Sequence, residues 1–235
     1  MASATIDYFF DDSHALAATF AQMVAANLRA GISARGRASI ALSGGTTPEK
    51  FLIELSTQPL DWSRVIVTLC DDRWVPPHSD RSNERLMRDT LLRNAAAPAE
   101  FVPLYVDVST PEQALIQLSA NIARVAPPFD VVVLGMGDDG HTASLFPDGD
   151  HLPAALDPNG SARVSPMRAP GAPEPRITLT LPALVATRAM YLHIEGAHKK
   201  DVFDRAMAAD GAHRHAPIRN VIDASHVTPG VFWCP

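Results

Sequence analysis

The stretch DVVVLGMGDDGHTASLFP, from Asp130 to Pro147, combines a strand signal with a polar turn. Its first part is a run of branched apolar residues at 131–134, and its second part is rich in glycine and polar residues. A continuous β-branched run is typical of a strand buried on both faces of a parallel sheet. Polar residues directly after such a strand lie at the edge where open α/β sheets bind ligands. The stretch therefore predicts an α/β fold with a site at this turn.

Similar apolar runs recur at residues 38–42, 65–69, 177–181 and 190–194. Helical patterns separate them, at 13–30 before Gly31, from Thr47 onward, and at 80–94, 110–125 and 197–209. This alternation predicts a mostly parallel, twisted sheet with helices on both faces. With 235 residues and 46% hydrophobic content, we expect one domain over residues 1–235.

The segment at about 147–175 interrupts this pattern. It contains seven prolines and shows no periodicity, which predicts a long excursion over the surface.

Composition limits the partners and the location. The formal net charge is −6, which argues against nucleic acid or an anionic membrane as the main partner. Cys70 and Cys234 form no CxxC pattern, so neither a disulfide framework nor a thiolate zinc site is expected. The first residues do not read as a signal peptide, and no apolar run reaches membrane length. We expect a soluble cytoplasmic protein, monomeric or homodimeric, that acts on a small molecule.

The opening stretch also matches the spacing of a dinucleotide fingerprint, in Gly135 to Gly140. That site requires an acidic residue about 20 positions later, at the end of a second strand. Gly160 stands there instead, within the proline-rich segment, and Asp138 and Asp139 would repel a pyrophosphate. The sequence does not support a dinucleotide site.

The same turn presents His141, with Asp139 two residues before it. A histidine titrates near neutral pH and can take a proton from water, and a nearby carboxylate can fix its tautomer. A lone histidine is more often structural, but its place in a glycine-rich turn after a buried strand favours function. Thr142 and Ser144 could cap a helix that follows.

Four further polar features are candidates for the same site. A loop after the strand at 38–42 has glycines and hydroxyls suited to a phosphate cradle, or to a tight turn with a helix cap: Ser43, Gly44, Gly45, Thr46 and Thr47. Asp71 and Arg73 follow another strand and could orient a hydroxyl and polarise a carbonyl, or form a surface ion pair. Arg176 and Lys199 could each reach a phosphate or be solvated charges.

Together these segments resemble the 6-phosphogluconolactonase family. The likeness runs from about residue 39 to 205 and rests on five segments in order: residues 43–48, 71–77 with 82–85, 135–147, 176–180 and 196–199. The resemblance implies a Rossmann-like sheet of the kind shared with glucosamine-6-phosphate deaminase and ribose-5-phosphate isomerase. One departure is Asp72, because the family has Glu at that position.

The resemblance also implies a reaction, the hydrolysis of 6-phospho-D-glucono-1,5-lactone to 6-phosphogluconate in the oxidative pentose phosphate pathway, without metal or organic cofactor. His141 would be the general base and Asp139 a candidate to orient it. Arg73 would stabilise developing negative charge, and Asp71 would hold a sugar hydroxyl or the water. The loop at residues 43–47, with Arg176 and Lys199, would bind the 6-phosphate.

Two alternatives belong to other functional classes. The related deaminase has a glutamate five residues after its histidine, where this chain has Phe146. A non-catalytic sugar-phosphate sensor is expected to lose the base or carry a DNA-binding segment. This chain keeps His141 and Arg73, and too few residues precede the first predicted strand for such a segment. Both features favour the lactone hydrolase.

Overall fold

In the described part of the chain, the main sheet carries seven strands in the order β1-β10-β9-β6-β2-β3-β5, and each neighbouring pair is parallel. A computed structural model describes residues 4–125, 127–208 and 215–235. The strands are β1 (Ile6–Phe9), β2 (Ala38–Leu42), β3 (Val65–Leu69), β5 (Glu100–Val102), β6 (Val131–Leu134), β9 (Met190–Glu195) and β10 (Gly230–Cys234).

The central strands agree with the sequence. Every residue of β2, β3 and β6 is buried, as expected for strands covered on both faces. The sequence missed β1, β5 and β10. Both outer strands, β1 and β5, are short and partly exposed, so they lack the apolar run that marks the centre of the sheet.

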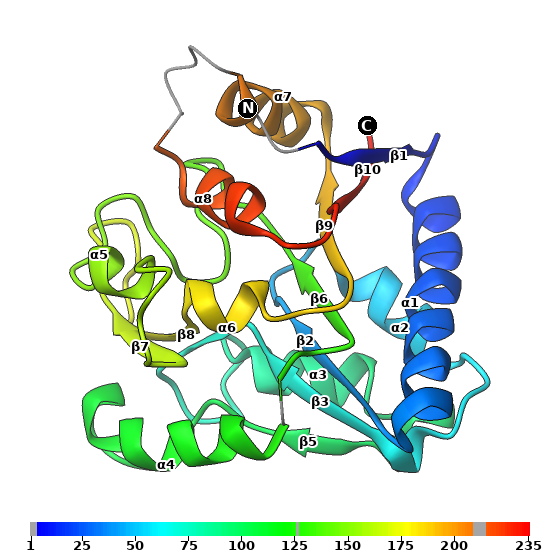
Figure 1. The fold of residues 1–235 in the computed structure, drawn as a ribbon, viewed down its shortest axis with the longest axis horizontal. Helices are drawn as coiled ribbons and strands as arrows, with labels where there is room; N and C mark the ends of the chain where they lie inside the picture. The colour runs from blue at the N-terminus through cyan, green and yellow to red at the C-terminus, as the bar shows by residue number, and fades with distance from the viewer. Residues whose placement is uncertain (1–3, 126, 209–214) are drawn as a thin grey trace.

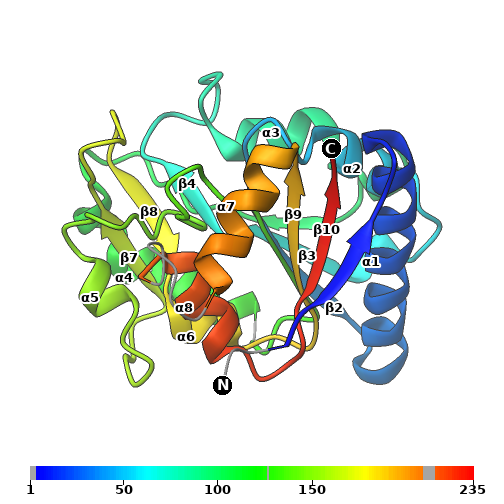
Figure 2. The ribbon, with the colours of Figure 1, turned by 90° about the horizontal axis from the view of Figure 1, so that it is seen from above.

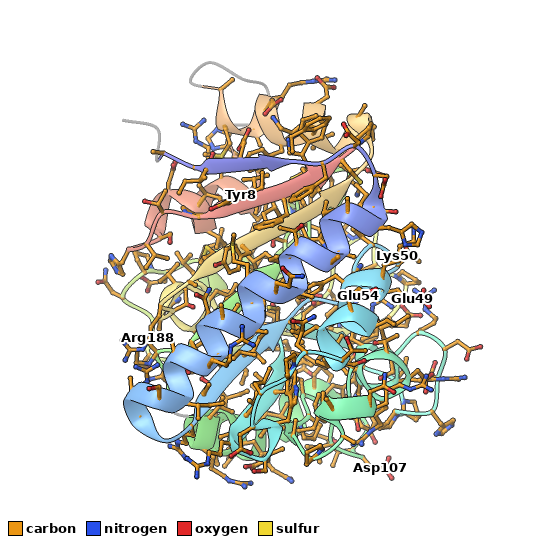
Figure 3. All side chains as sticks on the ribbon, turned by 90° about the vertical axis from the view of Figure 1, so that its right-hand side faces the viewer. Tyr8, Glu49, Lys50, Glu54, Asp107 and Arg188 are labelled. Carbon is orange, nitrogen blue, oxygen red and sulfur yellow. The ribbon has the colours of Figure 1, made fainter. Side chains whose placement is uncertain are left out.

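Helices cover both faces of the sheet (Figures 1 and 2). One face carries α1 (Ser13–Arg35) and α2 (Glu49–Ser56), and Figure 3 shows α1 crossing in front of the strands. The other carries α4 (Pro111–Val125), α6 (Leu181–Val185), α7 (Ala197–Met207) and α8 (Pro217–Ala224). The remaining helical segments are α3 (Asn83–Thr90), α5 (Leu152–Ala155) and the 3₁₀ turns η1 (Trp62–Arg64) and η2 (Asn94–Ala96). The predicted α/β architecture is therefore confirmed.

The predicted end of the first helix is wrong. The helix continues through Gly31 to Arg35, and Gly36 caps it in the left-handed region at φ 78°. Gly31 is required by packing instead, because a Cβ there would lie 2.7 Å from the carboxylate oxygen of Asp130. The last predicted helix ends at Met207, and its expected final residue, Ala209, lies outside the described residues.

A second, antiparallel sheet has the order β4-β8-β7 and contains β4 (Asp71–Arg73), β8 (Arg176–Leu179) and β7 (Val164–Met167). This corrects two predictions. The run at 177–181 does not join the parallel sheet, since it pairs with β4 and ends in α6. The segment 147–175 is not wholly a surface excursion, because β7 within it is buried. Pro166 hides this strand in the sequence, and it is tolerated because β7 is an edge strand.

Both cysteines are buried and free, in agreement with the sequence. Across residues 4–125, 127–208 and 215–235, no helix has the length and apolar content needed to cross a membrane.

Candidate functional site

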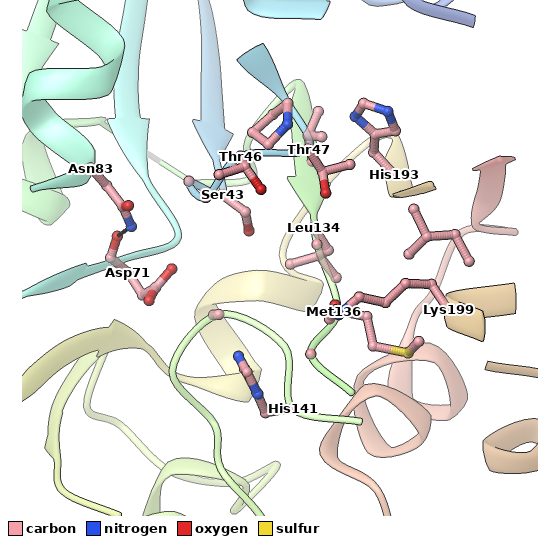
Figure 4. A pocket seen from close by; sticks show the side chains of 18 of the residues that line it. Ser43, Thr46, Thr47, Asp71, Asn83, Leu134, Met136, His141, His193 and Lys199 are labelled. Atoms are coloured by element: carbon pink, nitrogen blue, oxygen red, sulfur yellow. Dashed lines mark hydrogen bonds between the residues drawn. The ribbon is translucent and has the colours of Figure 1, made fainter. Parts of the chain in front are cut away.

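A cavity of about 280 Å³ lies at the carboxyl ends of β2, β6 and β9, beside β4 and β8. Every residue predicted for the site lines it except Asp139: Ser43, Gly44, Gly45, Thr46, Thr47, Asp71, Arg73, His141, Arg176 and Lys199. In Figure 4, His141 lies across the cavity from Ser43, Thr46 and Thr47. Asp71 and Lys199 lie at the two sides. The fold thus brings together residues more than 150 positions apart in the chain.

His141 and Asp139 form one wall. Asp139 Oδ1 lies 2.6 Å from His141 Nδ1 and accepts the His141 backbone N–H at 3.0 Å. Burial acts to raise the pKa of the Asp139 carboxyl, but the hydrogen bonds and charge of His141 outweigh it, so the pKa is lowered. The carboxylate therefore stays ionised and fixes Nδ1–H toward itself, which leaves Nε2 as the nitrogen that can accept a proton.

Two glycines shape the turn that carries His141. A Cβ on Gly137 would lie 2.1 Å from the Cε1 and Nδ1 atoms of the imidazole, so the ring packs directly on this backbone. Gly140 has a φ of +77°, and a Cβ there would lie 2.6 Å from the Ala216 Cβ. Gly137 thus leaves room for the imidazole, and Gly140 allows close contact with the segment that leads into α8.

The expectation that Thr142 and Ser144 cap a following helix is wrong. The described chain continues from this turn without a helix until α5, and both hydroxyls hold the turn itself. Thr142 Oγ1 donates to the Gly135 carbonyl at 2.8 Å, and Ser144 Oγ donates to Asp71 Oδ2 at 2.5 Å. The second bond connects the histidine turn to β4.

The pairing of β4 with β8 places three charged side chains on one face of the small antiparallel sheet. Asp71 lies opposite Thr178, and Arg73 lies opposite Arg176. Because side chains alternate along a strand and directly opposed residues share a face, Asp71 and the two arginines point to the same side. The two guanidinium groups repel each other, and Asp71 supplies one negative charge against these two positive ones. This face of the small sheet is therefore suited to an anionic ligand.

Arg176 is the more buried of the two arginines, with 8% of its surface exposed. Its guanidinium lies 5.6 Å from the centre of the Phe146 ring. Its Nε atom is buried and has no hydrogen-bond partner among the residues that the structure describes. Burial lowers the pKa of Arg176, and the positive charges of Arg73 and Arg81 act in the same direction. A guanidinium stays protonated even so, which leaves an incompletely paired positive charge on the cavity wall.

Asp72 lies on the opposite side of β4, is fully buried and does not line the cavity. It accepts hydrogen bonds from the backbone N–H groups of Asn83 at 2.7 Å and Glu84 at 3.1 Å, and so holds the start of α3. Burial raises the pKa of Asp72 to about 6, although these bonds act to lower it. Asp72, the residue at which this chain departs from the pattern it resembles, therefore holds the start of α3 in place beside the cavity.

The loop at residues 43–47 joins β2 to α2. The Ser43 backbone N–H donates to the Val133 carbonyl at 2.9 Å, and Gly45 takes a φ of +93°. Among the described residues, no side chain forms a capping hydrogen bond at the start of α2, so the alternative of a turn with a helix cap lacks its cap. Within the described parts of the chain, the buried Ser43 Oγ has no hydrogen-bond partner. An uncapped helix start, glycines and hydroxyls together suit an anionic group.

Lys199 closes the cavity from the start of α7. Its Nζ donates to the Met136 carbonyl at 2.8 Å and lies 2.9 Å from Asp138 Oδ1. The hydrogen bond from Lys199 is the main cause that lowers the pKa of Asp138. Lys199 thus lies between the glycine turn and the cavity, where it can approach an anion.

The sequence assigned no role to Asn83, Ala143 or His193, although all three line the cavity. His193 lies within a buried strand, where its sequence context resembles that of any interior residue. Asn83 lies in one of the segments that carry the family resemblance, but nothing in its spacing points to a ligand. Among the described residues, no group of three or more histidine, cysteine or acidic side chains could hold a metal ion.

Comparison with known proteins gives one consistent family. A sequence model described as glucosamine-6-phosphate isomerases/6-phosphogluconolactonase matches residues 11–231. A 6-phosphogluconolactonase of Rhizobium meliloti is 48% identical over 228 residues, which cover 97% of this chain and 98% of that protein. One of Pseudomonas aeruginosa is 42% identical and covers 90% and 87% of the two chains. The crystal structure of a 6-phosphogluconolactonase from Shewanella baltica superposes with a TM-score of 0.94 at 41% identity, over 100% of both chains.

Proposed function

The chain belongs to the glucosamine-6-phosphate isomerase/6-phosphogluconolactonase family, and we propose that it hydrolyses 6-phospho-D-glucono-1,5-lactone to 6-phosphogluconate. The observation that supports this reaction best is the placement of His141, paired with Asp139, across one cavity from an anion-binding wall. The reaction needs a base for water at the lactone carbonyl and a cationic site for the phosphate. The two walls of the cavity offer both.

In the proposed mechanism, His141 Nε2 takes a proton from a water molecule as the water attacks C1. The carboxylate of Asp139 stabilises the imidazolium that forms, since it lies 2.6 Å from Nδ1. The C1–O5 bond of the tetrahedral intermediate then breaks, and the imidazolium returns the proton to O5. The products are the open-chain carboxylic acid and a regenerated neutral imidazole.

Charges on the remaining walls hold the substrate in this mechanism. Arg73 stabilises the negative charge that develops on the carbonyl oxygen, and Asp71 holds a sugar hydroxyl or the attacking water. The loop at residues 43–47, Arg176 and Lys199 bind the 6-phosphate. Preorganised cations and N–H groups are effective here because they need no reorganisation during the reaction.

The deaminase alternative lacks its acid. At the fifth position after His141, the Phe146 ring packs 4.4 Å from the imidazole ring, measured between centroids. It also lies against the Arg176 guanidinium. The position that would need a carboxylate for ring opening therefore carries an apolar side chain that supports the base.

The direct test is hydrolysis of freshly prepared 6-phosphogluconolactone by the purified protein, against an enzyme-free blank because the lactone also opens spontaneously. Product is followed by coupling to 6-phosphogluconate dehydrogenase and NADP. Acceleration above the blank supports the proposal. A rate equal to the blank, together with release of ammonia from glucosamine 6-phosphate, would favour the deaminase.

The substitution Gly137→Ala is expected to abolish most of the activity while the protein stays folded. The added Cβ would lie 2.1 Å from the imidazole, so the ring must leave its place beside Asp139. The expected loss in kcat is about 10²-fold or more, the contribution of a positioned base. Gly171→Ala is the matched control, because a Cβ there meets no atom within 4 Å. Equal activity of the two variants would contradict the placement of the base.

Asp139→Asn is expected to lower kcat by about 10²-fold while the protein stays folded. The Asp139 carboxylate lies 2.6 Å from His141 Nδ1, and its lowered pKa keeps it charged. An amide at this position cannot supply that charge to the imidazolium that forms during the reaction. The measurement is kcat with the blank subtracted, beside a thermal unfolding curve. A variant with the wild-type kcat would show that the pair does not act in catalysis.

We further propose that the protein acts in the cytoplasm on this one phosphorylated sugar lactone, without nucleic acid or a membrane as partner, as a monomer or a homodimer. The net charge of −6 is consistent with a freely dissolved enzyme.

A further inference from the structure

Asn83 is the first residue of α3 and lines the cavity, although its residue surface is only 3% exposed. Its backbone N–H donates to Asp72 Oδ1 at 2.7 Å. Because Asp72 is the middle residue of β4 and is fully buried, the start of α3 is held firmly to that strand. The backbone of Asn83, from which the side chain extends, is therefore held in place at the cavity wall.

The orientation of the carboxamide is also fixed. Asn83 Nδ2 donates to the Asp71 backbone carbonyl at 2.8 Å. A carboxamide that uses its nitrogen on one side must present its oxygen on the other. Figure 4 shows the nitrogen directed at Asp71 and the oxygen turned away from it, toward the side of Ser43.

The oxygen lies against the glycine loop. A Cβ on Gly44 would lie 2.0 Å from Asn83 Oδ1 and 2.2 Å from its Cγ, so the carboxamide packs flat on the Gly44 backbone. Within residues 4–125, 127–208 and 215–235, no donor makes a hydrogen bond to this oxygen. An acceptor at the wall of a binding cavity with no protein donor is available to a ligand.

Asp71 supplies a second acceptor on the same wall. Ser144 occupies its Oδ2, while its Oδ1 has no hydrogen-bond partner among the described residues. Two neighbouring acceptors, one neutral and one charged, match donors on a ligand rather than phosphate oxygens. The hydroxyl groups of a sugar ring are such donors.

We propose that Asn83 Oδ1 accepts a hydrogen bond from the C4 hydroxyl of the lactone and so contributes to substrate specificity. The inference rests on the proposed function, in which His141 acts at C1 and the loop at residues 43–47 binds the phosphate on C6. In a 1,5-lactone the C5 oxygen is part of the ring, so C4 carries the hydroxyl nearest the phosphate. Asn83 Oδ1, packed on Gly44, lies at that end of the site.

The test compares kcat/KM for 6-phosphogluconolactone with that for its 4-deoxy analogue. The wild type should prefer the hydroxylated lactone roughly tenfold, the value of one hydrogen bond. In Asn83→Ala this ratio should fall close to one, because the acceptor is gone for both lactones. The ratio does not depend on how much of the preparation is folded. In Asn83→Asp an oxygen acceptor remains beside Gly44, so the preference should persist even if both rates fall.

Two further variants sharpen the result. Gly44→Ala leaves residue 83 unchanged but displaces its carboxamide, so it should also bring the ratio close to one. Arg88→Gln, on the same helix but outside the cavity, should keep the wild-type ratio.

An Asn83→Ala enzyme that slows equally on both lactones would overturn the inference, since that is the behaviour of a structural residue. That result, beside normal wild-type hydrolysis, would leave the proposed function intact. No hydrolysis by the wild type would overturn both.

Discussion

Replacing His141 with alanine is expected to lower kcat for lactone hydrolysis by about 10²- to 10⁴-fold, the usual contribution of a positioned general base. KM should change little, because the imidazole acts on water and does not hold the phosphate end of the substrate. The side chain is 30% exposed, and its described polar partner is Asp139, so its loss should not unfold the protein. The measurement is steady-state kinetics with the spontaneous rate subtracted, beside a thermal unfolding curve.

His151→Ala is the matched control for that experiment. His151 is also partly exposed and near a carboxylate, Asp150, but it lies outside the cavity, so its loss should leave kcat unchanged. If His141→Ala kept the wild-type kcat, the base would have to be another group at the cavity. Asp71 and His193, which also line it, would then be the candidates, and the site would have to be reassigned around them and Arg73.

The sequence predicted the centre of the sheet better than its margins, and the reason is burial. β2, β3 and β6 are covered on both faces, so their sequences are continuous apolar runs. β8 escaped assignment to a separate sheet because its pairing with β4 joins residues more than 100 positions apart in the chain. Pro166 also removed the local signal of β7.

The candidate site was predictable where a residue's chemistry stands out beside the end of a strand, as for His141 and Arg73. It was not predictable for Asn83, whose place depends on the packing of α3 against Asp72 and on the contact with Gly44. The end of α1 shows the same limit. Gly31 looks like a helix terminator in the sequence, but it is needed for close packing against Asp130.

The charges at the cavity suggest a conflict between stability and binding. β4 and β8 place Arg73 directly opposite Arg176, and the Arg176 Nε atom is buried with no hydrogen-bond partner in the described part of the chain. Neither feature favours folding, since a buried donor without a partner is costly and opposed like charges repel. Proteins keep such arrangements where binding needs them. We therefore expect the two arginines to stabilise the complex with the substrate more than they stabilise the substrate-free protein.

Arg176→Met tests that expectation with two results of opposite sign. Methionine keeps much of the apolar contact with Phe146 and removes the buried Nε that has no hydrogen-bond partner among the described residues, so the free energy of unfolding should rise by about 1 to 3 kcal/mol. KM for 6-phosphogluconolactone should rise about 10- to 100-fold, with a smaller change in kcat, because a charge-assisted contact to the phosphate is lost. Inorganic phosphate, as a competitor for the same subsite, should inhibit the variant more weakly than the wild type.

Arg168→Met separates this effect from the loss of any arginine. Arg168 is more exposed, is paired with Glu112 and lies outside the cavity, so its replacement should not stabilise the protein or change KM. A destabilised Arg176→Met with normal KM would make Arg176 a structural group and remove it from the phosphate subsite. A loss confined to kcat would instead move its role to the carbonyl oxygen, beside Arg73. Only a higher KM together with a more stable Arg176→Met variant fits an Arg176 guanidinium that binds the phosphate at the expense of the stability of the free protein.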